Sequence, residues 1–539
     1  MRNRGLRGLC YAARRFAPTT PLHTETSLRA FMTTDQPLIR TGEVDDELRR
    51  SVPAVAEVSS PTPALDKATA ALLSGSLWKG VAKFGVPMVG AMALHTTFNL
   101  VDIYLISRLP NATESLAAIG VCDMIAALAT IVSNGLSSAT VAVLSRRLGA
   151  RDQEGAARAT CQSLLVVGAL SVVFGVLGFA GAGWITGELM DLRGRTGQLA
   201  AEYLAVALGG SFSIFLLLQI TSVLRGLGSS KLPAFLLVAG NVLNLVLAVL
   251  FVFGPGPVPE PFGVFGPIAE ALSIPRMELV GAAWATVIGR TVPCLVGLAA
   301  LAWRPGRRVL FARYFKPSID EMVRLLRLGW PSSAQLVVRV AAILVLQAII
   351  SREYTTVDDA SALAAYGICL RLEMLALFIG LGWGAAASTF VGTNLGAGQP
   401  DRAVRAGWIA SSYNLVLMIG LTVVFLVMSR SILEFFDPDP RVVSAGQEYL
   451  LYVAPTYALV GVGAVLSQAL TGAGATMSSF VLDAIVLLGV QIPVALGCAV
   501  AFDLPRTVLW SIVAVGNVAS VAAYVVWYRR GSFVRTVIR

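Results

Sequence analysis

The sequence predicts an all-α membrane protein in which about twelve transmembrane helices form two six-helix, pseudo-symmetric bundles. Three observations predict this fold. The 539-residue chain is 56% hydrophobic and only 14% charged, with a mean hydropathy of +0.72, whereas soluble domains carry about 25% charged residues. Apolar segments of bilayer-spanning length alternate with short polar links. The second half of the chain also repeats features of the first.

Residues 1–78 differ in composition from the rest of the chain, since five arginines precede the first acidic residue and Pro, Ser and Thr recur. No apolar stretch follows these arginines, so the segment lacks the pattern of a secretory signal peptide. We expect a disordered cytosolic arm. An organellar transit peptide and a start codon assigned upstream of Met32 are the alternative interpretations.

Apolar segments follow Lys79, each long enough to cross a bilayer as a helix of ~20 residues. Lipid offers the backbone no hydrogen-bond partners, so these segments must be helical. The predicted spans of the first lobe, within residues 79–303, are 83–107, 116–144, 159–184, 200–224, 233–253 and 279–303. The predicted spans of the second lobe, within residues 329–528, are 329–351, 361–391, 403–428, 444–470, 477–502 and 507–528.

Lysine and arginine gather in alternate loops, most densely in the linker over residues 304–328 and again in the tail over residues 529–539. The opposite loops carry aspartate and glutamate. The positive-inside rule therefore predicts that both termini are cytoplasmic. We expect a multi-pass protein of the plasma membrane (bacterial inner membrane). The basic clusters are interpreted as topology signals, so nucleic-acid binding is not expected.

Four short motifs recur in order, at nearly the same spacing, in the two halves of the chain. The pairs are Gly85-Val86-Pro87 with Gly329-Trp330-Pro331, Ala117–Gly120 with Ala364–Gly367, Leu148–Asp152 with Leu395–Gln399, and Arg225–Gly228 with Thr471–Gly474. Each half has six spans, an even number, so both halves share one orientation and are related by an axis along the membrane normal. We expect substrate between the halves, near mid-depth.

Polar residues share one face of the first predicted span. His95, Asn99 and Asp102 are spaced at i, i+4 and i+7 on a helix. An aspartate at the bilayer centre costs about 2.5–3.5 kcal/mol, so Asp102 must face other helices or a water-filled cavity. We interpret Asp102 as a carboxylate whose charge state drives transport. The alternative is a structural acid that pairs with His95 or Asn244.

Other apolar spans also contain ionisable or polar residues. Asp123 and Asn134 lie eleven residues apart in span two, hence on nearly the same face, and Arg290 lies in span six. Arg339 and Arg371 lie in spans seven and eight. Our first interpretation is that arginines pair with acidic side chains of other helices. The alternative is that Arg290, Arg339 and Arg371 line the C-terminal half and attract an anion. All five residues are candidates, with His95, for the substrate cavity.

Five short motifs, in order over residues 80–528, resemble those of the multidrug and toxin extrusion (MATE) family. They are Asn99-Leu100-Val101-Asp102, Leu148–Asp152, Leu224–Gly228, Asn241-Val242-Leu243-Asn244 and Gly281–Thr286. The resemblance implies an antiporter that expels organic molecules, commonly amphipathic cations, in exchange for protons or sodium.

Within the family, the motifs of this chain resemble those of the DNA-damage-inducible F-like branch. The resemblance implies that Asp102 is the ion-coupled aspartate, in one motif with Asn99, and that Asn244 and Thr286 belong to the same ion site. A second aspartate of that branch is replaced here by Ala248. The resemblance therefore implies a proton site rather than a sodium site. The other branch's glutamate in span seven is replaced by an arginine, so a C-terminal cation site is not expected.

We predict a secondary active antiporter that exports small amphipathic organic compounds by alternating access. An organic-anion exporter and a lipid-linked sugar flippase of the same superfamily are the alternatives. No enzymatic activity and no cofactor beyond a coupling proton or sodium ion are expected, because the chain has only two histidines and no nucleophile motif. The six cysteines lack C-x-x-C spacing, so neither a metal site nor a disulfide framework is indicated. The expected partners are a small organic substrate and the lipid bilayer, with the protein as a monomer.

Overall fold

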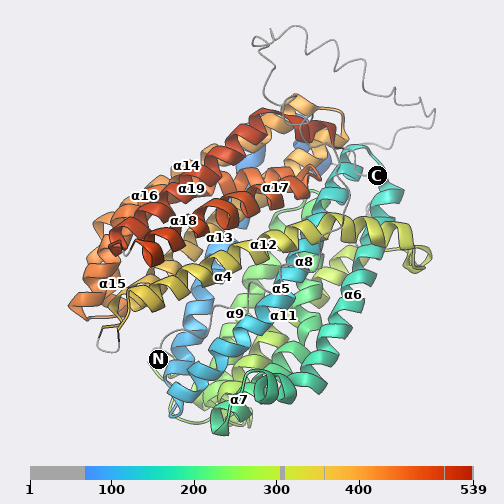
Figure 1. The fold of residues 1–539 in the computed structure, drawn as a ribbon. Coiled ribbons are helices and arrows are strands. Elements are labelled where there is room, and N and C mark those ends of the chain that lie inside the picture. The colour runs from blue at the N-terminus through green and yellow to red at the C-terminus, as the bar shows by residue number, and fades with distance from the viewer. Residues whose placement is uncertain (1–66, 261, 304–309, 357–358, 503, 537–539) are drawn as a thin grey trace, which may run out of the picture. The chain divides into compact units, whose positions relative to one another are not determined.

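The computed structural model describes residues 67–260, 262–303, 310–356, 359–502 and 504–536 (Figure 1). Every regular element in these residues is helical, and twelve helical segments are long and apolar enough to cross a membrane. The predicted fold class is therefore confirmed. Each of the twelve corresponds in order to one predicted span.

The first lobe contains six of these segments. They are α4 (Leu77–Ser107), α5 (Ala112–Gly149), α6 (Gln153–Trp184) with the π-helix η2 (Ile185–Leu189), α7 (Gly194–Gly209) joined to α8 (Ser211–Gly226), α9 (Lys231–Phe253) and α11 (Glu278–Trp303). The short helix α10 (Phe265–Ala271) precedes α11. Gly210 separates α7 from α8, and a side chain there would overlap Val287 of α11, so the break brings these helices close together.

The second lobe has the other six. They are α12 (Ile319–Glu353), α13 (Ser361–Gly396), α14 (Pro400–Val427), α16 (Pro440–Gly472), a span that joins α17 (Thr476–Asp483), the π-helix η4 (Ala484–Gln491), α18 (Ile492–Leu496) and the π-helix η5 (Gly497–Ala501), and finally α19 (Arg506–Arg529). The short helix α15 (Ser429–Phe436) follows α14. Helix α16 packs against α13, α14 and α19 and forms the centre of this lobe.

The structure differs from the predicted boundaries at three places. Helix α3 (Lys67–Leu73) lies within the range predicted as a disordered arm, because Leu72 is 3% exposed and packs on the core; residues 1–66 lie outside the described residues. Helix α12 begins ten residues before the predicted start of the seventh span at residue 329, because the charged side chains of its first turn lower the hydropathy there. Short 3-10 helices, η3 (Ala312–Phe315) and η6 (Ser532–Arg535), occur in the linker and the tail.

The predicted repeat is visible in the backbone at the ends of matching helices. Arg151 and Gly398 both have positive φ, 61° and 70°, and Gly228 and Gly474 have φ of 81° and 82°. Left-handed residues of this kind end helices by allowing a backbone hydrogen bond across the last turn. The backbone hydrogen bonds repeat as well. After the second span of each lobe, the N–H of Asp152 donates to the carbonyl oxygen of Arg147 (2.9 Å), and the N–H of Gln399 donates to that of Asn394 (2.8 Å). After the fourth span, the N–H of Ser229 donates to the carbonyl oxygen of Leu224 (2.9 Å), and the N–H of Ala475 donates to that of Leu470 (2.9 Å).

The two lobes meet through α4 and α5 on one side and α12, α13 and α14 on the other. Glycines permit the close approach. A Cβ at Gly135 would overlap Ser333, and a Cβ at Gly149 would overlap the carbonyl oxygen of Thr393. Such small-residue contacts are the usual means by which membrane helices approach.

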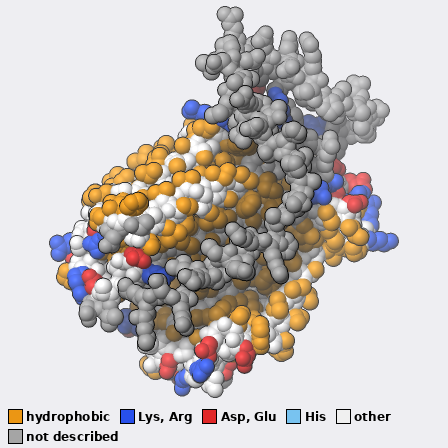
Figure 2. Space-filling view, viewed as in Figure 1, with side chains coloured by type: hydrophobic (Ala, Val, Ile, Leu, Met, Phe, Trp, Pro, Cys, Tyr) orange, Lys and Arg blue, Asp and Glu red, His pale blue; other side chains and the backbone are white. Residues whose placement is uncertain are grey.

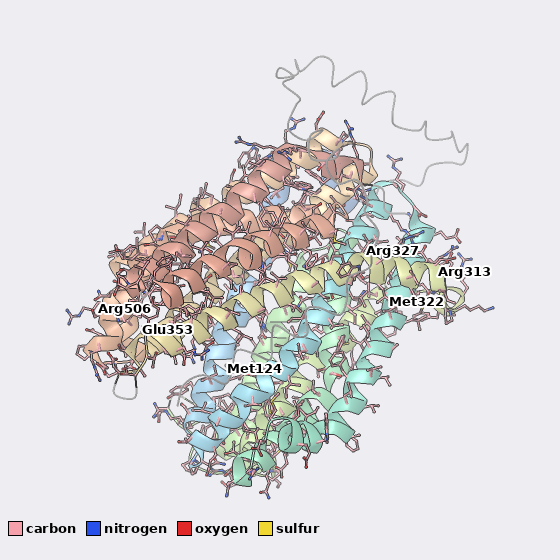
Figure 3. The ribbon with its side chains drawn as sticks, in the orientation of Figure 1. Met124, Arg313, Met322, Arg327, Glu353 and Arg506 are labelled. Atoms are coloured by element: carbon pink, nitrogen blue, oxygen red, sulfur yellow. The ribbon has the colours of Figure 1, made fainter. Side chains whose placement is uncertain are left out.

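Charged side chains connect the two lobes at one end of the helices. Arg147 Nη2 lies 2.7 Å from Glu321 Oε1, with both side chains largely buried. Arg146 donates from Nη2 to the carbonyl oxygen of Ala473 at 2.8 Å and from Nη1 to that of Thr536 at 2.6 Å. This end carries the arginine-rich loops, and Figure 3 places Arg327 near it and Glu353 at the opposite end of α12. The connected end is therefore the one predicted to face the cytoplasm.

Exposed apolar side chains cover the flanks of the helices. Figure 2 shows hydrophobic side chains over most of the visible flank, while charged side chains gather towards the ends. Val416 and Phe179, for example, are 72% and 84% exposed. Exposed apolar area of this extent is typical of a protein surrounded by lipid.

We expect Gly149→Ala to lower the free energy of unfolding by about 1–3 kcal/mol, because the new methyl group overpacks the contact with Thr393. Unfolding in mixed detergent–SDS micelles, followed by tryptophan fluorescence, measures the change. Gly120→Ala is the matched control on the same helix, since no atom lies within 4 Å of its added Cβ. That control should be neutral or slightly stabilising; a Gly149→Ala protein as stable as the control would contradict the packing argument.

Candidate functional site

Two polar contacts join α4 to α9 inside the first lobe. His95 Nδ1 lies 3.2 Å from Asn241 Oδ1. In the orientation that satisfies both ends of the Asn244 amide, Nδ2 donates to Oδ2 of Asp102 at 3.2 Å and Oδ1 accepts from Thr286 Oγ1 at 3.0 Å. The structure thus brings Asp102, Asn244 and Thr286 together, as the resemblance implied. Asp102 contacts Asn244 rather than His95, whose imidazole bonds Asn241 instead.

The contact between Asn244 and Thr286 depends on a close crossing of α9 and α11. A Cβ added at Gly289 would lie 2.9 Å from the Cα and Cβ of Asn244, and one added at Gly240 would lie 3.1 Å from the carbonyl oxygen of Gly289. Both glycines therefore let the two backbones approach until the amide of Asn244 reaches the hydroxyl of Thr286. A larger residue at either position would separate the pair.

Three charged groups interact electrostatically around this site. The Arg290 guanidinium, one turn after Thr286 on α11, interacts electrostatically with Asp102 and Asp123. Tyr203 of α7 is close enough to interact with the same groups. Two carboxylates and one guanidinium give the cluster a net charge of about −1 when all three are ionised.

The other predicted site residues have different surroundings. Asp123 interacts electrostatically with Arg290 but is exposed on α5, next to Met124, which is 57% exposed (Figure 3). Asn134 is half-buried and donates to the carbonyl oxygen of Thr130 in its own helix at 2.9 Å. The side chain of Asn99 lies outside the described residues. Ala248 is 2% exposed within the core of the first lobe.

The alternative in which three arginines line the C-terminal half is wrong for Arg290, because α11 belongs to the first lobe. Arg371 is exposed on α13. It lies two turns before Phe378, whose ring contacts that of His95 at a centroid distance of 5.7 Å. Helical spacing therefore places Arg371 on the face of α13 that is turned towards α4.

Helix α4 links the candidate site to both lobes. Its first half, through Val81, Phe84 and Met88, belongs to an apolar cluster formed mainly by the second lobe. Its second half, through Leu105 and Ile106, belongs to the core of the first lobe. Asp102 lies in this second half, so a change in its surroundings bears on a helix that contacts both lobes.

The second lobe contains a separate buried polar cluster. Arg339 Nε lies 2.7 Å from Oδ2 of Asp483, whose side chain is 1% exposed. Gln335 Nε2 donates to the same oxygen at 2.7 Å, and the Tyr524 hydroxyl donates to Oδ1 at 2.8 Å. The pairing of arginine with an acid on another helix, our first interpretation, is therefore confirmed for Arg339. Asp483 ends α17 where the π-helix η4 begins, and π segments are frequent at functional sites.

A cavity of about 130 Å³ adjoins this cluster, and its lining includes Arg339, Asp483 and Glu373. The hydroxyl of Tyr449 donates to Glu373 Oε2 at 3.3 Å. Glu373 also interacts electrostatically with Arg339. The cavity thus holds two acids for one arginine.

Sequence reasoning did not single out several members of these clusters. Tyr203 in the first lobe and Gln335, Tyr449 and Tyr524 in the second are polar residues within apolar spans. For the three tyrosines, that position is the signal that the sequence offers. Gln335 also lies one turn before Arg339 on α12, which places the two side chains on one helix face.

Comparisons with known proteins agree with the predicted resemblance. The sequence model of the MatE family matches residues 87–250 and 336–496, more than half of the chain. The chain is similar to "Probable multidrug resistance protein YpnP" of Bacillus subtilis (strain 168), with 27% identity over 76% of this chain and 86% of the relative. It is also similar to "FAD transporter" of Shewanella oneidensis, with 26% identity over 79% of this chain and 88% of that protein.

A solved structure described as the "outward-facing conformation of a multidrug resistance MATE family transporter of the MOP superfamily" shares the fold, with a TM-score of 0.74 and 25% identity. The alignment covers 88% of this chain and 99% of that one. The family match, the twelve helices and the twofold repeat lead to one conclusion: the chain belongs to the MatE family of multidrug and toxin extrusion transporters.

Proposed function

We propose that this protein is a secondary antiporter that exports small amphipathic organic compounds in exchange for protons by alternating access. The relatives named as multidrug resistance proteins support the substrate class. The charge distribution of the loops supports an orientation in which both termini are cytoplasmic, in the bacterial inner membrane. The observation that carries the proposal is the Asp102 carboxylate on the helix that contacts both lobes.

Protonation of Asp102 would change its bond to Asn244. The ionised carboxylate accepts the Asn244 N–H, and a proton on the carboxylate would weaken this charge-assisted bond. It would also remove the attraction of Asp102 to Arg290. Both changes act on α4, so proton binding would alter how α4 packs against the two lobes.

The amide of Asn244 supports a proton over a sodium ion as the coupling ion. A hard cation needs several oxygen ligands. Here the amide presents its N–H₂ group to Asp102 and its oxygen to Thr286, and Ala248 supplies no second carboxylate. A sodium ion beside Asp102 would therefore lack these oxygens as ligands, whereas a proton needs none of them.

The contacts between the lobes support an outward-facing state. The pair Arg147–Glu321 and the bonds of Arg146 all lie at the end predicted as cytoplasmic. Alternating access would require these contacts to break when the cytoplasmic side opens. Together these contacts stabilise the state in which the cytoplasmic side is closed. Binding of substrate or protons would shift the equilibrium towards the state in which that side is open.

Charge favours organic cations over anions as substrates, because Asp102 and Asp123 outnumber Arg290. Two observations support the second candidate, an organic-anion exporter. Arg371 is exposed on the face of α13 that is turned to the first lobe, and a relative is named as a transporter of FAD, which is an anion. An anion exporter would use Arg371 and Arg290 as binding groups and would reject cationic dyes.

Proteoliposomes that contain the purified protein and a fluorescent organic cation such as ethidium test the proposal. We expect efflux to accelerate when the outside is made acidic, and to return to the basal rate when a protonophore collapses the gradient. A sodium gradient imposed at equal pH should have no such effect. Acceleration by sodium alone would contradict proton coupling, and release of loaded FAD without release of the dye would favour the anion exporter.

A further inference from the structure

A second cavity, remote from both polar clusters, lies between the N-terminal parts of α4 and α14. It has a volume of about 300 Å³ and is lined by Leu77, Trp78, Arg402, Arg405 and Ile409. The two helices pack against each other, so the cavity lies in the groove between them. Its lining combines two arginines with apolar and aromatic side chains.

No carboxylate neutralises these two arginines among the ion pairs of the described residues. Arg402 donates from Nη1 and Nη2 to the backbone carbonyls of Gly75 and Ser74, at 3.2 and 3.1 Å, and its Nε is buried without a partner. Arg405 makes one long bond, from Nε to the carbonyl oxygen of Asp401 at 3.4 Å. The cavity therefore presents two adjacent positive charges that repel each other.

In the predicted orientation, the cavity lies at the level expected for the lipid headgroups of the cytoplasmic leaflet. It lies at the predicted cytoplasmic end of α14, whose outer flank continues as exposed apolar side chains, with Val416 72% and Val423 53% exposed. Trp78 is 50% exposed and packs edge-on against Tyr413 at a centroid distance of 5.4 Å. Tryptophan is enriched at the membrane–water interface, and basic pockets between helices on this side bind anionic headgroups.

We infer that this groove binds an anionic phospholipid, with its phosphate on Arg402 and Arg405, its glycerol beside Trp78 and its acyl chains along the apolar flank of α14. A free phosphate ion would gain nothing from that flank, so charge and apolar surface together select a lipid. The bound phosphate would hold the first turn of α4 against α14 and so strengthen the contact between the lobes. This site is independent of the coupling mechanism proposed above.

Native mass spectrometry and lipid titration of the full-length protein in detergent test the inference. We expect phosphatidylglycerol to bind and to raise the unfolding temperature, while phosphatidylcholine and inorganic phosphate do neither. Arg402→Gln combined with Arg405→Gln should weaken phosphatidylglycerol binding about 30-fold, and Arg405→Gln alone about fivefold. The single variant guards against a folding defect, since it loses only the long bond to Asp401.

The charge-matched control is Arg529→Gln combined with Arg530→Gln, which removes two exposed positive charges from the same predicted side of the membrane. It should retain wild-type binding. Equal binding of phosphatidylcholine, unchanged binding by the Arg402 and Arg405 variants, or an equal loss in the control would each overturn the inference. Competition by millimolar inorganic phosphate would instead identify a free-anion site and would also overturn it.

Discussion

We expect Asp102→Asn to reduce proton-driven efflux by about tenfold or more, to the level of protein-free vesicles, while the protein still inserts and folds. The asparagine keeps the size of the side chain and can still accept the N–H of Asn244, but it cannot exchange a proton. The charge that attracts Arg290 is also lost. Dye efflux from proteoliposomes under an imposed pH gradient measures the effect, and the elution profile of the purified protein checks its folding.

Glu202→Gln is the matched control for this experiment. Glu202 lies in the same lobe, next to Tyr203, but its side chain is exposed. The same loss of one negative charge should leave gradient-driven efflux within about twofold of the wild type, since surface substitutions away from a site change energies by ~0.5 kcal/mol or less. Equal efflux by Asp102→Asn and wild type would remove Asp102 from the mechanism, whereas equal losses in both variants would point to net charge instead of the site.

The spans could be predicted from sequence because length and apolar composition are sufficient for a helix in lipid. The same argument fails at the ends of helices, where charge is tolerated. The first turn of α12 holds Asp320 and Glu321, which favour a helix N-terminus but lower the hydropathy. Glu321 then forms its ion pair with Arg147 of the other lobe, a contact that hydropathy cannot reveal.

Site residues could be named from the sequence more readily than their partners. The resemblance implied Asp102, Asn244 and Thr286, but the direction of the Asn244 amide depends on the crossing of α9 and α11 at Gly240 and Gly289. That crossing is a property of packed backbones and leaves no periodicity in the sequence.

The partner of Arg339 illustrates the same limit. Arg339 and Asp483 are 144 residues apart, and their pairing requires α17 to pack against α12. Sequence reasoning could expect Arg339 to pair with some acidic side chain of another helix, because an isolated charge in a membrane is costly. It could not select this pair from the other acids in the spans, nor add Gln335 and Tyr524 as further donors.

The energetic consequence of this pair follows from its burial. The Asp483 side chain is 1% exposed, whereas that of Arg339 is 26% exposed and lines the adjoining cavity. Removal of Arg339 leaves a buried carboxylate with only neutral donors. Removal of Asp483 leaves a guanidinium that can reach the cavity. Loss of Arg339 should therefore lower the free energy of unfolding more than loss of Asp483.

We expect Arg339→Met to lower the free energy of unfolding by about 3–5 kcal/mol, because it leaves the buried charge of Asp483 uncompensated. Asp483→Leu should cost less. The double variant, Arg339→Met with Asp483→Leu, should recover most of the loss, since a neutral apolar pair of similar size needs no compensation. SDS-induced unfolding of the purified proteins measures all three values.

The exposed pair of Arg430 and Glu434 on α15 is the control, because it has the same N···O distance of 2.7 Å but side chains that are 75% and 43% exposed. Arg430→Met should cost about 0–1 kcal/mol, as exposed pairs usually do. If Arg339→Met costs no more than Arg430→Met, burial does not determine the strength of the pair. If the double variant is no more stable than Arg339→Met, the loss comes from packing of the arginine side chain and not from the unpaired carboxylate of Asp483.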